Sequence, residues 1–203
     1  MTDAELLERW HAGDGAAGNT LFERYFDVLY RFFRNKVDDG IDDLLQETLL
    51  ACVRGRERFR GEATFRTYLF AIARNVLYGH WERRARRAAD VDVGELSIEA
   101  MSTSPSGVIG RAAEHRLLVR ALRAIPLELQ VVLELHFWED LSGPELAVVL
   151  DIPEGTVRSR LRRAREQLEA KMIELTDDQR LLSSTRDGLE AWASGLKELV
   201  HQP

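Results

Sequence analysis

Apolar residues recur along most of this chain at the three- and four-residue steps of an amphipathic helix, and this spacing limits what the chain can fold into. Residues 21–37 repeat aromatic and aliphatic side chains at those steps, and the alternation of a β-strand is absent there and nearly everywhere else. Two further helices are predicted over about 41–53 and 64–87. The apolar stripe of the latter consists of Phe65, Tyr68, Leu69, Ile72, Val76 and Leu77. The sequence therefore predicts an all-α fold that begins with one small bundle.

The helical pattern stops at residues 88–110, AADVDVGELSIEAMSTSPSGVIG, whose Ser, Thr, Gly, Pro and acidic residues are typical of a flexible linker. It resumes after this segment, and Pro126 begins another helix because proline is favoured in a first helical turn. Two shorter helices follow, divided at Asp151 to Pro153, so the second part is predicted to be a bundle of four helices. The predicted domains are residues 1–87, the linker 88–110, residues 111–172, and a helical extension over residues 173–203.

The composition of the chain argues against several classes of function. The formal net charge is −6, so contact with nucleic acid must be confined to local basic patches. The histidines are scattered and Cys52 is the single cysteine, so no metal site and no cofactor is predicted. No nucleophile motif or phosphate-binding glycine loop stands out, which argues against an enzyme. No apolar run approaches the about 20 residues that cross a bilayer, and the start MTDAELLERW lacks a secretory signal, so a cytoplasmic protein without membrane insertion is expected.

Positive charge is concentrated in one segment, EGTVRSRLRRAR, which starts at Glu154. It follows the capping-box pair Ser142 and Glu145 and a short turn, and the whole has the form of a helix-turn-helix. The apolar residues of its second helix recur at helical steps, so the arginines occupy the opposite face. The planar fork of arginine bonds guanine edges and grips phosphates, which predicts a DNA-reading helix. A solvated arginine face is the alternative.

The predicted contacts of this helix divide by their place on it. Base edges in the major groove are assigned to Arg158, Ser159, Arg162 and Arg163, while Arg160 and Arg165 flank them toward the phosphate backbone. Thr156, at the start of the helix, completes the predicted set.

Taken together, the sequence resembles a bacterial RNA polymerase sigma factor of the extracytoplasmic-function (ECF) type, within the sigma-70 family. DDLLQETLLACV at 42–53 is similar to the polymerase-binding helix, and TFRTYLFAIARNVLYGHWERRARR at 64–87 is similar to the promoter-melting and minus-10 helix. The segment 125–168, which contains the helix-turn-helix, resembles the minus-35 reading domain. The resemblance covers about residues 15–172. It implies that 1–87 corresponds to sigma region 2 and 111–172 to sigma region 4.

An acidic segment at residues 38–47, DDGIDDLLQE, carries five acids and no base, which would repel DNA and suits a basic protein surface. The resemblance implies that this helix grips the clamp of the polymerase β′ subunit through Asp43, Gln46 and Glu47, with Leu49 as an apolar neighbour. Acids that only favour a helix N-terminus are the alternative reading.

The basic end of the segment 64–87 is the second predicted DNA contact. By resemblance this helix lies on the minus-10 duplex, and a flipped base is captured near the loop that precedes it, at a site that stacking and hydrogen bonds would stabilise. The residues that the resemblance implies are Arg60, Phe65, Arg74, Asn75, Arg83, Arg84, Arg86 and Arg87. Cations that only stabilise a helix C-terminus are the alternative, and Phe65 and Tyr68 fit a core as well as a stacking role.

The chain departs from the family pattern at a few positions. Leu49 and Val53 stand where the family often has aromatic residues, and Tyr68 where it often has tryptophan. Asp151 stands where the recognition turn often has glycine, and Asp also adopts turn or left-handed geometry at modest cost.

Residues 173–203 lie beyond the resemblance. Thr176 and Gln179 have capping-box spacing, and an amphipathic helix is predicted that packs on a bundle or on a regulator. Its heptad-like positions are Leu182, Leu189, Trp192, Leu196 and Leu199.

The function that these features imply is a dissociable initiation factor, which does no chemistry itself. It would bind core RNA polymerase at the β′ clamp and the β flap, and it would recognise and melt promoter DNA. An anti-sigma factor is a further partner that the resemblance allows. One rival is a stand-alone helix-turn-helix regulator that binds palindromic operators as a dimer. Another is a sigma-like interaction protein that titrates a regulator without initiating transcription.

Overall fold

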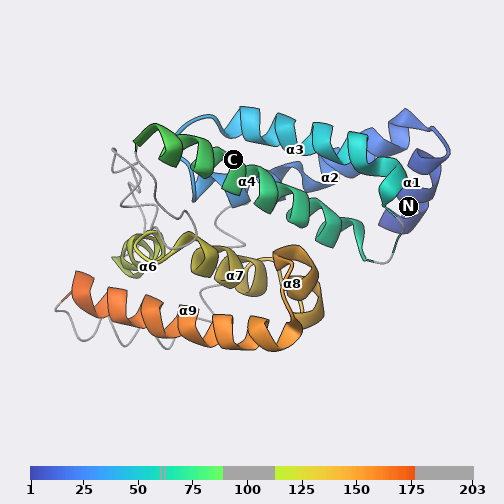
Figure 1. Cartoon of the computed structure of the whole chain (residues 1–203). Coiled ribbons are helices and arrows are strands. Elements are labelled where there is room, and N and C mark those ends of the chain that lie inside the picture. The colour runs from blue at the N-terminus through green and yellow to red at the C-terminus, as the bar shows by residue number, and fades with distance from the viewer. Residues whose placement is uncertain (60, 62, 89–112, 177–203) are drawn as a thin grey trace. The chain divides into compact units, whose positions relative to one another are not determined.

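The computed structural model describes residues 1–59, 61, 63–88 and 113–176, and every regular element in these ranges is a helix (Figure 1). The predicted all-α fold is confirmed. Most of the predicted linker and nearly all of the predicted C-terminal helix lie outside the described residues. The helices divide into a first unit with α1, α2, α3 and most of α4, and a second unit with α6, α7, α9 and the start of α8.

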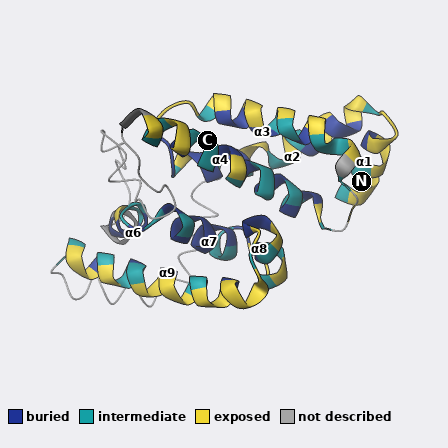
Figure 2. Cartoon of the chain, viewed as in Figure 1, coloured by how far each residue is buried: buried dark blue, intermediate teal, exposed yellow. Residues whose placement is uncertain are grey.

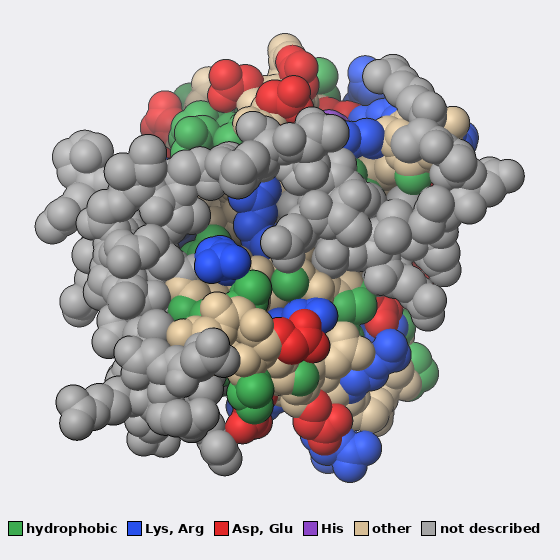
Figure 3. Space-filling model, turned by 90° about the vertical axis from the view of Figure 1, so that its left-hand side faces the viewer, with side chains coloured by type: hydrophobic (Ala, Val, Ile, Leu, Met, Phe, Trp, Pro, Cys, Tyr) green, Lys and Arg blue, Asp and Glu red, His purple; other side chains and the backbone are tan. Residues whose placement is uncertain are grey.

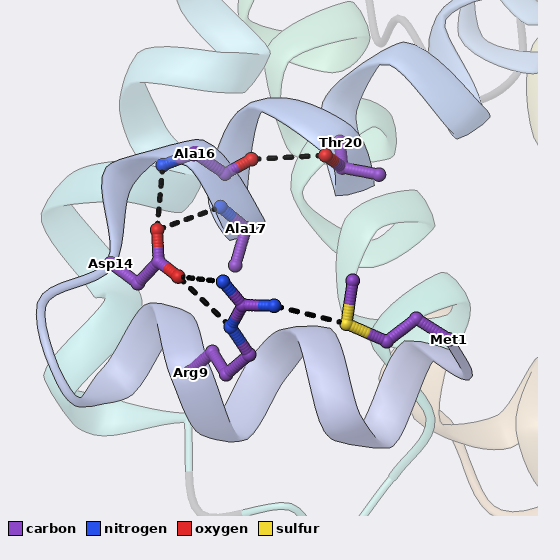
Figure 4. A network of polar contacts seen from close by, with 6 residues as sticks. All are labelled: Met1, Arg9, Asp14, Ala16, Ala17 and Thr20. Carbon is purple, nitrogen blue, oxygen red and sulfur yellow. Dashed lines mark hydrogen bonds and ion pairs between the residues drawn. The ribbon is translucent and has the colours of Figure 1, made fainter.

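The first unit begins with two helices, and Asp14, between them, caps the second and bonds to a side chain of the first. Helix α1 spans Asp3–His11 and α2 spans Gly15–Arg34. Asp14 caps α2, because its Oδ1 accepts hydrogen bonds from the backbone N–H of Ala16 at 3.0 Å and of Ala17 at 3.2 Å (Figure 4). Its Oδ2 accepts from Arg9 Nε at 2.9 Å. The Ala17 amide first, and then Arg9, hold the pKa of Asp14 below its ordinary value.

Sequence analysis did not identify α1 and began the second helix too late, at residue 21. The signal that could have found α1 is local. Thr2 and Glu5 form a capping box, in which Thr2 N–H donates to Glu5 Oε2 at 2.6 Å and Glu5 N–H donates to Thr2 Oγ1 at 3.3 Å. The short helix contributes Leu6 and Trp10 to the core.

The remaining elements of the first unit are α3 at Ile41–Gly55, a 3-10 turn at Arg56–Arg58 and α4 at Phe65–Ala88. Their core is rich in aromatic rings. Phe65 is 1% exposed, and its ring lies 5.6 Å from that of Tyr25 and 6.3 Å from that of Trp10. Trp10 also covers Gly18, where an added Cβ would lie 2.5 Å from two indole atoms. Aromatic packing therefore ties α1, α2 and α4 together.

The second unit contains α6 at Ala113–Arg123, α7 at Leu127–Phe137, α9 at Glu154–Leu175 and the start of α8, which spans Gly143–Leu150. Helix α9 packs against α6 and α7. Figure 2 shows α7 buried along most of its length and α9 exposed along its outer face. The prediction that α9 is a short helix is wrong, because its buried stripe continues through Leu168 to Met172.

The predicted helix-turn-helix features are present in α8, α9 and the turn between them. Ser142 N–H donates to Glu145 Oε2 at 2.9 Å, and Glu145 N–H donates to Ser142 Oγ at 3.4 Å, as the predicted capping box requires. Asp151 has φ +53°, so it adopts the left-handed conformation expected where a turn glycine is replaced. Pro153 then stands at the N-cap of α9.

Candidate DNA and protein interfaces

Four of the five clustered arginines of α9 are exposed, and three of them, Arg158, Arg162 and Arg163, lie on its outer face. Val157 and Ala164 are fully buried and Leu168 is 3% exposed, so these predicted stripe residues do face inward. On the opposite face the Arg158 and Arg162 side chains are 77% and 79% exposed, and Arg163 is also exposed. Burying one stripe of a helix turns the residues of the other face outward. The structure therefore brings the predicted base-reading arginines together on one solvent-facing surface.

Two of these arginines have acidic neighbours one turn away along α9. Arg158 Nη2 lies 4.0 Å from Glu154 Oε1, and Arg162 Nε lies 3.7 Å from Glu166 Oε1. All four side chains are more than half exposed, and such surface pairs contribute little to stability. A phosphate or a guanine edge can displace these carboxylates at small cost. Ser159 Oγ donates to the Thr156 carbonyl at 2.9 Å, which leaves Oγ able to accept.

The other two arginines of the cluster face side chains of their own unit. Arg160 Nη2 lies 3.2 Å from Glu128 Oε2 on α7, and the two side chains are only 19% and 23% exposed. The Arg165 guanidinium lies 4.9 Å from the ring centroid of Phe137, also on α7. Sequence analysis placed both on the phosphate-facing flank and did not identify these partners.

The predicted polymerase-binding residues lie on one exposed side of α3. Asp43, Gln46 and Glu47 are exposed and Leu49 is half-buried. Beside them an apolar groove of about 320 Å³ lies between α2 and α3. The residues that line it are Phe26, Asp42, Leu45, Gln46, Leu49, Leu50 and Val53. Acidic and apolar side chains lie together at the top of Figure 3, the level at which Figure 1 shows α3.

Sequence analysis missed part of this groove. Phe26, Leu50 and Val53 are 44%, 46% and 47% exposed, so large apolar side chains meet solvent there. The signal in the sequence was helix periodicity: successive residues are rotated by about 100°, which places Leu50 on the side opposite the core face that Leu44, Leu45 and Cys52 fill. The contribution of Phe26 depends on how α2 crosses α3.

The predicted minus-10 residues are distributed over α4. Arg74 Nη1 donates to Asn75 Oδ1 at 3.2 Å, and its guanidinium lies 4.8 Å from the Tyr78 ring centroid. Asn75 and Arg86 are exposed, while Arg84 is half-buried. Arg83 Nη2 lies 3.3 Å from Glu47 Oε2 on α3, with both side chains about half exposed. One ion pair therefore joins a predicted DNA residue to a predicted polymerase residue.

Among the predicted minus-10 residues, Phe65 is buried, and the side chains of two others are not described. Phe65 packs inside the aromatic core, so a base could stack on it only if this core opened. Arg60 and the Arg87 side chain lie outside the described residues.

The titratable core groups do not suggest a reactive centre. Cys52 is fully buried, and burial raises the pKa of its thiol to about 12, which keeps the thiol protonated at neutral pH. Burial also raises the pKa of Tyr68, with a smaller contribution from Cys52. Among the described residues, no cluster of three or more His, Cys, Asp or Glu side chains could hold a metal ion. None of the described helices is long and apolar enough to cross a membrane.

Comparison with known proteins gives consistent matches over both units. Residues 21–87 match the family model "Sigma-70 region 2", and residues 115–168 match "Sigma-70, region 4". The chain is 30% identical over 181 residues to the ECF RNA polymerase sigma-E factor of Escherichia coli (strain K12), which covers 85% of this chain and 95% of the relative. It is 32% identical over 183 residues to the sigma-E factor of Haemophilus influenzae, with 85% and 96% covered.

Solved structures resemble the fold. CnrH, in complex with the cytosolic domain of CnrY, matches with a TM-score of 0.63 and 22% identity, over 86% of this chain and 99% of that chain. The sigma factor RpoE of Bartonella quintana, in complex with the anti-sigma factor NepR, matches with a TM-score of 0.60 and 20% identity, over 79% and 98%. At these identities the likeness concerns the fold alone.

Proposed function

The chain belongs to the sigma-70 family, in its ECF branch, and from this premise we propose that it binds core RNA polymerase and directs it to specific promoters. The observation that carries the proposal is the contrast between two exposed helix faces on one chain. One face is acidic and apolar, on α3, and the other is arginine-rich, on α9. A factor that joins an enzyme to DNA needs both kinds of surface.

The α3 surface suits a protein partner. Asp43, Gln46 and Glu47 supply carboxylates and an amide, and the groove beside them offers apolar area that is removed from water on binding. Negative charge there repels nucleic acid and attracts a basic protein surface. We assign this surface to the clamp of the polymerase β′ subunit.

The α9 surface suits duplex DNA. Arginines at positions 158, 162 and 163 project from one helix face, and an α-helix of this kind fits the major groove. We assign them to the minus-35 element. Arg74, Asn75 and the basic end of α4 are assigned to the minus-10 element, where strand separation begins.

The protein itself carries out no reaction in this proposal, since RNA synthesis is performed by the polymerase that it joins. It acts in the cytoplasm, where the bacterial polymerase meets the chromosome. Residues 1–87 serve as the region 2 domain and residues 111–172 as the region 4 domain. An anti-sigma regulator is a candidate partner, because the structure of the Bartonella RpoE contains the anti-sigma factor NepR and that of CnrH contains the cytosolic domain of CnrY.

Run-off transcription with purified core polymerase and a promoter library tests the proposal. We expect transcripts from a subset of templates only when the protein is present. Binding of the protein alone to palindromic sites, with no transcript from any template, would instead favour a stand-alone helix-turn-helix regulator. A matched pair of variants separates the two surfaces: Leu50→Glu should lower transcription by weakening polymerase binding, and Arg163→Ala should leave polymerase binding intact and change template choice.

A further inference from the structure

The five arginines of α9 occupy two different kinds of position on the helix. Successive residues are rotated by about 100°, so the apolar stripe formed by buried Val157, Ala164 and Leu168 and half-buried Leu161 has a well-defined centre. Arg160 and Arg165 lie about 70° to either side of that centre. The other three arginines lie about 90° or more away from it. The first two therefore border the packed face on opposite sides, and the other three project from the rest of the helix.

The two bordering arginines contact opposite ends of α7. Arg160 pairs at 3.2 Å with Glu128, in the first turn of α7, and Arg165 lies over the ring of Phe137, the last residue of α7. Those two partners are nine residues apart, or about 13 Å along the helix axis. An acidic side chain such as Glu128 is also favoured in the first turn of a helix, where it faces the positive end of the helix dipole. With 19% and 23% exposure, the pair is shielded from solvent far more than the pairs on the outer face of α9.

We propose that Arg160 and Arg165 are positioning residues, which set the rotation of α9 about its own axis against α7, while Arg158, Arg162 and Arg163 read the DNA. The proposal rests on the proposed function and divides its arginine row into two roles. Contacts on both borders of the stripe resist rotation in both directions. A rotation of about 20° displaces groups at the helix surface by about 2 Å, which is enough to break a two-pronged arginine–guanine contact.

Glu128 distinguishes this role from a direct phosphate contact. If Arg160 gripped DNA, Glu128 would compete with the phosphate, and its removal would strengthen binding to every sequence equally. If Arg160 positions α9, removal of Glu128 releases the helix and weakens binding to the preferred minus-35 element. The two roles therefore predict opposite changes for one substitution at a residue that is itself acidic.

The experiment measures promoter choice by holoenzyme, made from core polymerase and the full chain. Competition between the preferred minus-35 element and a scrambled one gives a specificity ratio, and the affinities are measured across salt concentrations. We expect Glu128→Gln and Arg160→Gln each to lower the ratio about tenfold, comparable to one lost two-pronged base contact, and the double variant to be no worse. Phe137→Leu, which keeps an apolar side chain of smaller volume and removes the ring face, should lower the ratio by a smaller factor.

Exchanging the charges of residues 128 and 160 tests the pair itself, separately from the loss of either side chain. Glu128→Arg combined with Arg160→Glu restores the pair in reverse, and we expect it to recover the ratio to within about threefold of the original chain. Thermal unfolding of each variant verifies that the second unit stays folded. A variant that fails to fold is replaced by Arg160→Lys, which keeps a pairing cation and should retain most of the ratio.

Three outcomes would overturn the proposal. In the first, Glu128→Gln raises affinity for all sequences alike while Arg160→Gln reduces the salt slope by about one, which identifies a phosphate contact. In the second, the specificity ratio stays unchanged in every variant. In the third, the exchanged pair behaves no better than Arg160→Gln. Failure of the proposed function is seen separately, because holoenzyme with the unchanged chain would then show no preference between the two elements.

Discussion

Helices α3 and α9 each expose a face to solvent, and the two faces differ in both charge and apolar content. On α3 the carboxylate of Asp42 lines a groove with half-exposed Leu50 and Val53, and Asp43 and Glu47 are exposed on the same helix. On α9, every exposed residue from 154 to 165 is either polar or glycine, and the apolar residues are turned inward. The sign of the charge selects the class of partner. Exposed apolar area indicates that hydrophobic burial will contribute to binding. A protein partner can provide such burial, whereas a DNA groove largely cannot.

The largest expected effect is a charge reversal on α9. Arg163→Glu removes an exposed cation from the proposed reading face and adds repulsion toward phosphate, so minus-35-dependent binding by holoenzyme should fall about 100-fold. Affinity for core polymerase should not change. Arg120→Glu, at an exposed position in the last turn of α6, is the matched control and should have an effect below about fivefold. Equal effects of the two variants would mean that α9 contributes only general charge.

A smaller loss is expected when the α3 groove receives a charge. Leu50 is 46% exposed, so Leu50→Glu should leave the free energy of unfolding nearly unchanged. Burial of a leucine stabilises a complex by about 1.5 to 3 kcal/mol, so affinity for core polymerase should fall about tenfold or more. Titration of core polymerase with labelled protein measures this. Ile173→Glu, at a 57% exposed position on α9, is the control, and an equal loss there would remove the distinction between the two surfaces.

The features that the sequence predicted correctly depend on residues close together along the chain. The capping box of Ser142 and Glu145, the left-handed Asp151 and the buried stripe of α9 each require only helix periodicity or turn chemistry. The partner of Arg160 could not be predicted in that way. Glu128 is 32 residues earlier, and only the way α7 crosses α9 brings the two side chains together.

The α3 groove shows the same limit. Helix periodicity indicates that Leu50 lies opposite the core face of α3, but the contribution of Phe26 required the packing of α2 on α3. The helix α1 was missed for a different reason: it is short and mostly polar, so its apolar periodicity is weak, and only its capping box marked it. Local chemistry thus predicted elements and faces, while crossings between helices determined which faces acquire neighbours.

A change in the core of the first unit separates loss of folding from loss of an interface. At Gly18 an added Cβ would lie 2.5 Å from Trp10 Cδ1 and Nε1, so the indole ring, which is only 5% exposed, would have to shift within the core. Gly18→Ala should therefore lower the free energy of unfolding by about 1 to 3 kcal/mol. Thermal and denaturant unfolding measure it. Gly15→Ala, where nothing lies within 4 Å, is the control and should be neutral or slightly stabilising. Under conditions where both variants are folded, affinity for core polymerase should match that of the original chain.

The smallest effect is expected at the ion pair between Glu47 and Arg83, which joins the two kinds of surface. The 3.3 Å contact links side chains that are about half exposed. The coupling free energy between them should therefore be about 0.2 to 1 kcal/mol, which is a factor of less than about five in the equilibrium constant of unfolding. A double-mutant cycle with Glu47→Gln and Arg83→Gln measures this coupling in the free protein through its unfolding free energy.

If the surfaces have the proposed partners, Glu47→Gln should change two affinities in opposite directions: that of the protein for core polymerase and that of holoenzyme for the minus-10 duplex. Glu47→Gln removes a carboxylate from the polymerase side, so affinity for core polymerase should fall. It also releases Arg83, so holoenzyme formed at saturating protein should hold the minus-10 duplex slightly more tightly, and this gain should vanish when Arg83 is glutamine as well. Gln46→Ala, which changes a neighbouring exposed residue without a charge, is the control and should alter only polymerase affinity. A loss of DNA affinity in Glu47→Gln that persists in the double variant would show that Glu47 acts on DNA by another route, and the division of charge between α3 and the basic helices would not hold.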